Sequence, residues 1–170
     1  MPGRWRKVLL AIATLVAASI AFAGWYRVHY SMGVARSFEV NEPNSAQRVL
    51  VATQGSEFKD ALVVALVAHL EARKCHVKVI DIAALPAANP GEWQAIVILH
   101  TWEMRKPPAQ VKAFVDRARG SGKLVVLTTS GAGDFMMEGV DAISSASVMT
   151  DVPARAAQIA ARVDVLLGAP

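Results

Sequence analysis

The chain has 170 residues, enough for one ordinary domain and an appendage but not for two full cores. Its formal net charge is +4, of which residues 1–45 carry +3 and residues 46–170 only +1. The larger part therefore has no basic stripe that would bind nucleic acid. The single cysteine, Cys75, excludes an internal disulfide framework and a cysteine-rich metal site, so we expect neither nucleic acid nor metal as a partner.

An apolar segment of membrane length lies near the N-terminus. Residues 8–26 contain no charged residue, and as a helix they would span roughly 28 Å, close to the ~30 Å core of a bilayer. Residues 1–26 are therefore predicted to be either a single-pass anchor held by membrane lipid or a signal peptide cleaved before Gly24. Three basic residues precede the run and two follow it, which favours an extracytoplasmic domain by one charge.

Residues 27–47 show no sustained helical or strand periodicity. They end in the turn-rich stretch "NEPNS" at residues 41–45, which is typical of a tether. We therefore expect a linker at residues 27–47 and a domain at residues 48–170.

Apolar, β-branched stretches alternate with helical patterns along this domain. Strands are predicted at residues 49–53, 77–82, 95–99, 123–129 and 140–147. Helices are predicted at residues 58–73, between Pro107-Pro108 and Gly120, and at 153–167 after an N-cap at Thr150 or Asp151. This alternation implies right-handed βαβ units, and hence a five-stranded parallel sheet of the α/β class with helices on both faces. Five strands suit the doubly wound order 2-1-3-4-5, with the half-polar second strand at an edge.

Three loops of this sheet are candidates for a ligand site. In an open parallel sheet, ligands bind outside the carboxyl ends of the strands, near the switch point between the first and third strands. The loops there would be "TQGSEFKD" at residues 53–60, "HTWEMRKPP" at 100–108 and "SGAGDFMMEG" at 130–139.

Two of these regions carry a resemblance to a known family. The stretch "PPAQVKAFVDRA" at residues 107–118 and the loop "SGAGD" at 130–134 make residues 48–167 resemble the flavodoxin family, including its quinone- or menaquinone-dependent oxidoreductases. The resemblance implies a flavodoxin-like fold, an FMN cofactor, and electron transfer or quinone-type reduction with a quinone or a redox partner protein. It implies that the first loop holds the FMN phosphate and that the other two loops border the flavin ring. The cofactor-binding residues implied are Thr53, Gln54, Gly55, Ser56, Lys59, Thr101, Trp102, Ser130, Gly131, Ala132, Gly133 and Asp134.

The first loop departs from the family pattern. Positions where the family usually brings hydroxyl side chains to the phosphate hold Ala52, Gln54 and Glu57. Two unit charges ~5 Å apart at an effective dielectric of about 20 repel by roughly 3 kcal/mol, so a phosphate beside Glu57 needs compensation, which Lys59 could supply. In the alternative interpretation, Ser56 caps the helix and Glu57 complements its positive end, so that the loop is only a corner.

The other candidate residues also have structural interpretations. Trp102 could stack on a flavin or pack on its own loop, and His100 is expected to be a hydrogen-bonded structural residue. Phe135 and the methionines after it could form one wall of a ring pocket or cover the sheet. Two functions therefore remain open: a membrane-tethered FMN-binding redox domain, and a cofactor-free flavodoxin-like interaction or accessory module. No catalytic residue is predicted.

Overall fold

The computed structural model describes residues 2–30, 32–103 and 105–168, and its chain divides into two compact units, Met1–Met32 and Gly33–Pro170. The first unit is the helix α1 (Pro2–Tyr30). Its segment Gly3–Trp25 has a mean hydropathy of 2.2 and none of it is buried, so it is long and apolar enough to cross a membrane. A signal sequence near an N-terminus meets the same conditions, so the segment is either an anchor or a signal.

The second unit is built on a six-stranded sheet. Its strands are β1 (Phe38–Val40), β2 (Arg48–Thr53), β3 (His76–Asp81), β4 (Ala95–Thr101), β5 (Leu124–Thr129) and β6 (Asp141–Ser145). They lie in the order β1-β3-β2-β4-β5-β6, and every neighbouring pair is parallel except β1 with β3. The five parallel strands thus have the predicted order 2-1-3-4-5, which confirms the flavodoxin-like α/β class.

The sixth strand, β1, lies within the stretch that was predicted to be a linker. It pairs antiparallel with β3, Phe38 opposite Val79 and Val40 opposite Val77. The prediction that β3 forms an edge was therefore wrong. The polar residues of β3 contact the neighbouring strand β1. Glu39 Oε1 lies 2.7 Å from Lys78 Nζ, and Glu39 Oε2 lies 3.2 Å from His76 Nε2.

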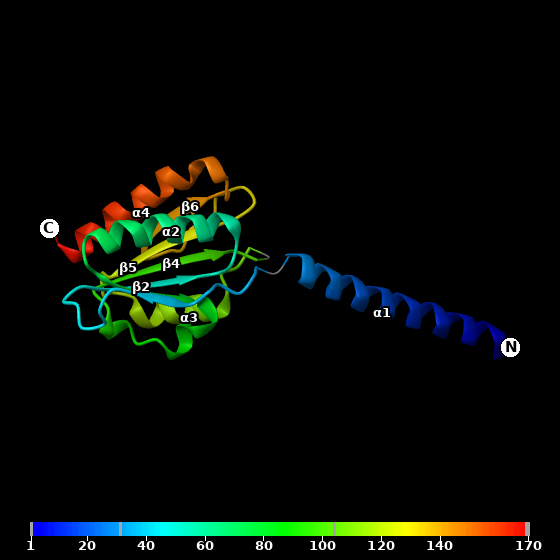
Figure 1. Ribbon diagram of the computed structural model, residues 1–170. Coiled ribbons are helices and arrows are strands. Elements are labelled where there is room, and N and C mark those ends of the chain that lie inside the picture. Colours follow the sequence, from blue (N-terminus) through cyan, green and yellow to red (C-terminus); the bar gives the residue numbers. More distant parts are fainter. Residues whose placement is uncertain (1, 31, 104, 169–170) are drawn as a thin grey trace. The chain divides into compact units, whose positions relative to one another are not determined.

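Helices cover both faces of the sheet (Figure 1). On one face lie α2 (Glu57–Ala72) and α4 (Val152–Leu167), the latter preceded by the short η3 (Met149–Asp151). On the other lie α3 (Ala109–Ala118) and two 3₁₀ helices, η1 (Ile82–Ala87) and η2 (Pro90–Glu92), which form the crossover from β3 to β4. Alternate strand residues enter two separate cores. For example, Val51 packs in the α2 cluster and Leu50 in the α3 cluster, so the strands are apolar on both sides.

Helix α2 allows the core on its face to be tested with a matched pair. Leu66 is 1% exposed, whereas Val64 on the same helix is 69% exposed. Leu66→Ala should lower the free energy of unfolding by about 2–5 kcal/mol because it leaves a cavity, and Val64→Ala should change it by less than ~1 kcal/mol. Urea denaturation followed by circular dichroism measures both, and equal losses would contradict the packing described.

Candidate functional site

The carboxyl edge of the sheet carries a cluster of hydroxyl groups around one buried amine. The strands β2, β4 and β5 each end in a threonine, of which Thr101 and Thr129 lie with their Oγ1 atoms 2.7 Å apart. Lys59 Nζ donates to Thr101 Oγ1 at 2.8 Å and to Ser56 Oγ at 3.3 Å. We call Lys59, Ser56, Thr101 and Thr129 the amine–hydroxyl cluster.

Lys59 lies in an environment that disfavours its charge. It is 1% exposed and sits in the first turn of α2, where the helix dipole already presents positive charge. Burial lowers the pKa of Lys59 to about 8, although the carboxylates of Asp60 and Glu103 act in the opposite direction. A buried cation is stabilised by negative charge, which the carboxylates of Asp60 and Glu103 supply in part at this edge of the sheet.

The loop between β2 and α2 is fastened to the sheet by its own groups. Ser56 caps α2, its Oγ accepting from Lys59 N at 3.3 Å, as predicted. Gln54 N donates to Leu99 O at 3.3 Å, and Gln54 Oε1 accepts from Thr101 N at 2.7 Å. Thr53 Oγ1 donates to the carbonyl of Gln54 at 3.2 Å. These hydrogen bonds fix the conformation of the loop.

Residues 33–36, which we call the strap, lie over this loop. Gly55 N donates to Gly33 O at 2.7 Å, and the two glycines form an antiparallel bridge. The strap is also tied to the end of β3, because Ala35 N donates to Asp81 Oδ2 at 2.7 Å. A Cβ on Gly55 would lie 2.9 Å from Gly33 O and from Val34 O, so the approach of the strap requires glycine at position 55.

The FMN phosphate implied by the resemblance does not fit on Gly55 in this arrangement. The Gly55 amide, which would donate to a phosphate oxygen, already donates to a carbonyl oxygen of the strap. Backbone atoms of the strap lie so close to Gly55 that not even a methyl group would fit beside it. The first loop is therefore a corner completed by the chain itself, and a phosphate would have to displace the strap.

Trp102 and Phe135 bring the second and third loops together. Their rings stack with centroids 4.8 Å apart and planes 12° apart, and the Arg105 guanidinium lies 5.7 Å from the Phe135 centroid. The indole Nε1 of Trp102 is buried and has no hydrogen-bond partner within residues 2–30, 32–103 and 105–168. The sequence drew attention to Trp102 and to a possible wall at Phe135, but no local pattern signals that the two rings meet.

The third loop, residues 130–134, is a closed turn. Ser130 Oγ accepts from Gly133 N at 2.9 Å and from Asp134 N at 3.3 Å, and it donates to Asp134 Oδ1 at 3.3 Å. Gly133 has φ of 70°, and a Cβ there would lie 2.7 Å from Ala146 N, so the turn itself requires this glycine. Gly131 and Ala132 are exposed. The loop thus lies at the predicted edge, and a ligand-binding role for its residues stays a prediction.

His100 has the structural role expected of it. It is fully buried, and its Nε2 lies 3.1 Å from Thr128 Oγ1. Burial lowers the pKa of His100 to about 4, and the nearby charge of Lys59 acts in the same direction. His100 is therefore neutral at physiological pH and does not serve as a charged group of the site.

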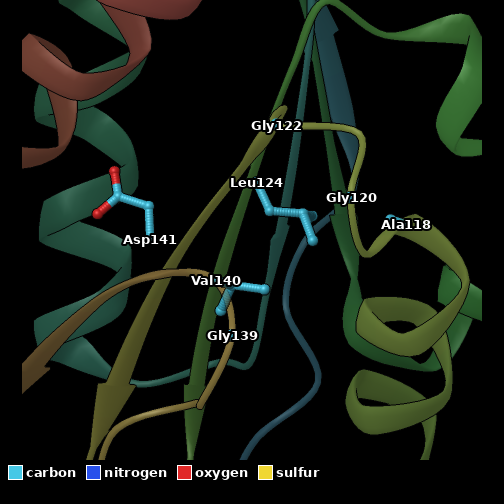
Figure 2. A pocket seen from close by; sticks show the side chains of 7 residues that line it. All are labelled: Ala118, Gly120, Gly122, Leu124, Gly139, Val140 and Asp141. Atoms are coloured by element: carbon cyan, nitrogen blue, oxygen red, sulfur yellow. The ribbon is translucent and has the colours of Figure 1, made fainter.

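Two hollows lie elsewhere on the domain. One of about 470 Å³ lies where α3 ends and β5 and β6 begin, at the amino ends of these strands (Figure 2). Its lining contains three glycines and a carboxylate, Asp141, that already pairs with Arg162. The other, of about 460 Å³, lies beside η1, where Arg48 stacks on Trp93. Among the described residues, no group of three or more His, Cys, Asp or Glu side chains is placed to hold a metal ion.

Comparison with known proteins gives matches of low similarity. No family model and no curated protein matches the chain. A solved flavodoxin from the domain Archaea is 15% identical with a TM-score of 0.49, and the match covers 71% of this chain and 99% of that one. An oxidoreductase from Corynebacterium diphtheriae is 13% identical with a TM-score of 0.47, over 72% and 98% of the two chains. A flavodoxin, WrbA-like protein from Agrobacterium tumefaciens is 16% identical with a TM-score of 0.41, over 72% and 98%.

The class of the protein rests on its own strand order, which is that of a flavodoxin-like domain.

The buried amine predicts a specific pH dependence of stability. Between the pKa of Lys59 in the folded chain, about 8, and its unfolded value of 10.5, the unfolded chain binds more protons, so stability should rise with pH. The gain should reach up to about 3 kcal/mol relative to Lys59→Met, in which this titration is absent. Denaturant unfolding at pH 7.5 to 10.5 measures it. The control is Lys112→Met, at a lysine whose side chain is 62% exposed, and its stability should rise with pH as in the wild type. If the stability of the wild type changed with pH in the same way as that of Lys59→Met, the lowered pKa of Lys59 would be contradicted.

Proposed function

We propose that this protein is a membrane-tethered flavodoxin-like domain that binds a flavin ring at the carboxyl edge of its sheet and takes part in electron transfer or quinone-type reduction. The observation that carries the proposal is the Trp102–Phe135 stack, whose buried indole N–H has no acceptor in the described chain. Such an unpaired buried donor costs about 1–3 kcal/mol, and a ring carbonyl bound there would satisfy it. The bound flavin would supply the redox chemistry, and the chain would bind and orient it.

The residues around the stack suit a flat ring that carries carbonyl oxygens. Trp102 and Phe135 lie 4.8 Å apart, so a ligand ring would enter by separating them and would contact an aromatic face on each side. Lys59 donates to Thr101, the residue before Trp102, and so places a buried cation at the same edge. A cation there favours a ring system that carries negative charge.

The tether and the charge of the domain bear on its electron partner. The apolar segment Gly3–Trp25, retained as an anchor, would keep the domain beside membrane lipid. Residues 46–170 carry a net charge of only +1. Electrostatic attraction would therefore do little to steer the domain onto a carrier protein. A membrane quinone is the partner we favour, with a redox protein as the alternative, and the charge flanking the segment favours an extracytoplasmic domain.

A second candidate function is a cofactor-free interaction or accessory module. It is favoured by two features that close the carboxyl edge of the sheet: the strap covers the Gly55 amide, and the rings of Trp102 and Phe135 already stack on each other. In this case the fold serves as an anchored scaffold, and the amine–hydroxyl cluster only fastens α2 to the sheet.

Flavin titration of the full-length chain in detergent distinguishes the two functions. Riboflavin or FMN should lose fluorescence on binding, and Trp102→Ala and Phe135→Ala should each weaken binding by roughly tenfold or more, because each removes one face of the stack. Met136→Ala is the matched control, since Met136 follows Phe135 and is 52% exposed. A chain that melts cooperatively but leaves both flavins unquenched would establish the cofactor-free module instead.

A further inference from the structure

We propose that the strap stands in for the phosphate group of the ligand, so that the carboxyl edge of the sheet selects a flavin whose side chain ends in a hydroxyl, as in riboflavin, over the phosphorylated FMN. The choice between ligands rests on the proposed flavin function. The claim that the strap occupies the phosphate position does not rest on that function, and it can be tested without any flavin.

The first argument concerns hydrogen-bond roles at Gly55. A phosphate at the start of α2 would present acceptor oxygens to backbone N–H groups. Gly33 O is such an acceptor, and it already lies 2.7 Å from Gly55 N. A phosphate oxygen brought to the same amide would meet another acceptor with no proton between them, so the two exclude each other.

The second argument concerns space. A single added Cβ on Gly55 would come within 2.9 Å of the carbonyl oxygens of Gly33 and Val34. A phosphate group is larger than a methyl group, and the atoms it would meet are backbone atoms that cannot turn aside like the end of a side chain. The strap must therefore leave before a phosphate can bind.

The third argument concerns what holds the strap. Ala35 is 6% exposed, and its N–H donates to the Asp81 carboxylate at 2.7 Å, a charge-assisted bond. The strand β1 begins at Phe38, two residues after the strap, and pairs with β3. The strap and the segment that follows it are therefore both held to β3.

Charge near the start of α2 is a further factor. The exposed Glu57 in the first turn of α2 adds negative charge near a phosphate, and the positive charge of Lys59 opposes this effect.

The strap is tested first with inorganic phosphate, on the ¹⁵N-labelled full-length chain in detergent micelles. In the wild type the Gly55 amide should exchange slowly with solvent, and its resonance should not move with phosphate. Asp81→Ala removes the acceptor of Ala35, so the Gly55 amide should exchange roughly tenfold faster or more and should shift on phosphate addition. Asp81 also caps η1, its Oδ1 accepting from Ala83 N at 2.8 Å. Asn89→Ala is therefore the matched control, because it removes the comparable cap of η2 at Gly91 without touching the strap.

The selection is tested by titrating riboflavin and FMN into the same three proteins. The wild type and Asn89→Ala should bind riboflavin about tenfold or more tightly than FMN, and Asp81→Ala should bring the ratio toward one. A wild type that binds FMN at least as tightly as riboflavin, or whose Gly55 resonance moves with phosphate, would overturn the inference.

The remaining outcomes separate the two proposals. If neither flavin binds while Gly55 responds to phosphate only in Asp81→Ala, the flavin function fails, and so does the choice between flavins, but the strap is shown to exclude phosphate. If Gly55 in Asp81→Ala stays protected and insensitive to phosphate, the strap does not control this position and the inference fails, whichever flavin binds.

Discussion

The hydrogen bond from Gly55 N to Gly33 O decides how the carboxyl edge of this sheet can be used. Buried backbone donors in folded proteins are almost always paired, and at the start of α2 the partner could have been a ligand or the chain itself. In this protein the partner is the chain. That single contact fixes position 55 as glycine, places the strap over the first loop, and turns the phosphate position of a flavodoxin-like sheet into a completed corner. In the proposed function, the aromatic pair Trp102 and Phe135, and not this loop, would therefore hold the ligand.

Lys59 gives the same edge a second property. Its burial at the positive end of α2 disfavours its charge, whereas the hydroxyls of Ser56 and Thr101 accept its hydrogen bonds and the carboxylates of Asp60 and Glu103 favour the charge. The edge therefore combines an amine that favours negative charge with a strap that closes the anion position on Gly55. In the proposed function, a ligand that meets both conditions has partly negative oxygens on its ring and lacks a phosphate. The carbonyl oxygens of a quinone or of an unphosphorylated flavin meet both conditions, and FMN meets only the first.

The sequence predicted those features that leave a periodic or local signal. The apolar, β-branched runs and the helices between them gave the strands and their order, and the cap at Ser56 followed from its place before an acidic first turn. The strand β1 was missed because three residues are too few to show alternation. The strap was missed because Gly33 acts through its backbone carbonyl, which leaves no trace in residue type. The burial of Lys59 was missed because lysine is normally solvated, and the Trp102–Phe135 stack joins loops that only the fold brings together.

In the proposed function, the strength of the strap sets how selective the carboxyl edge of the sheet can be. A neutral backbone hydrogen bond contributes about 0.5–1.5 kcal/mol net, and a bond to a carboxylate contributes about 1.5–3 kcal/mol. The contacts at Gly55 and Ala35 together thus hold the strap by roughly 2–4.5 kcal/mol, and a phosphate that displaces it loses this much affinity, a factor of about 30 to 2,000. This range is wide enough to reject FMN in favour of an unphosphorylated ring, yet small enough for the loss of one carboxylate at Asp81 to remove most of the preference. Selectivity in this fold can therefore depend on a few residues that precede the sheet and belong to none of the three loops at its carboxyl edge.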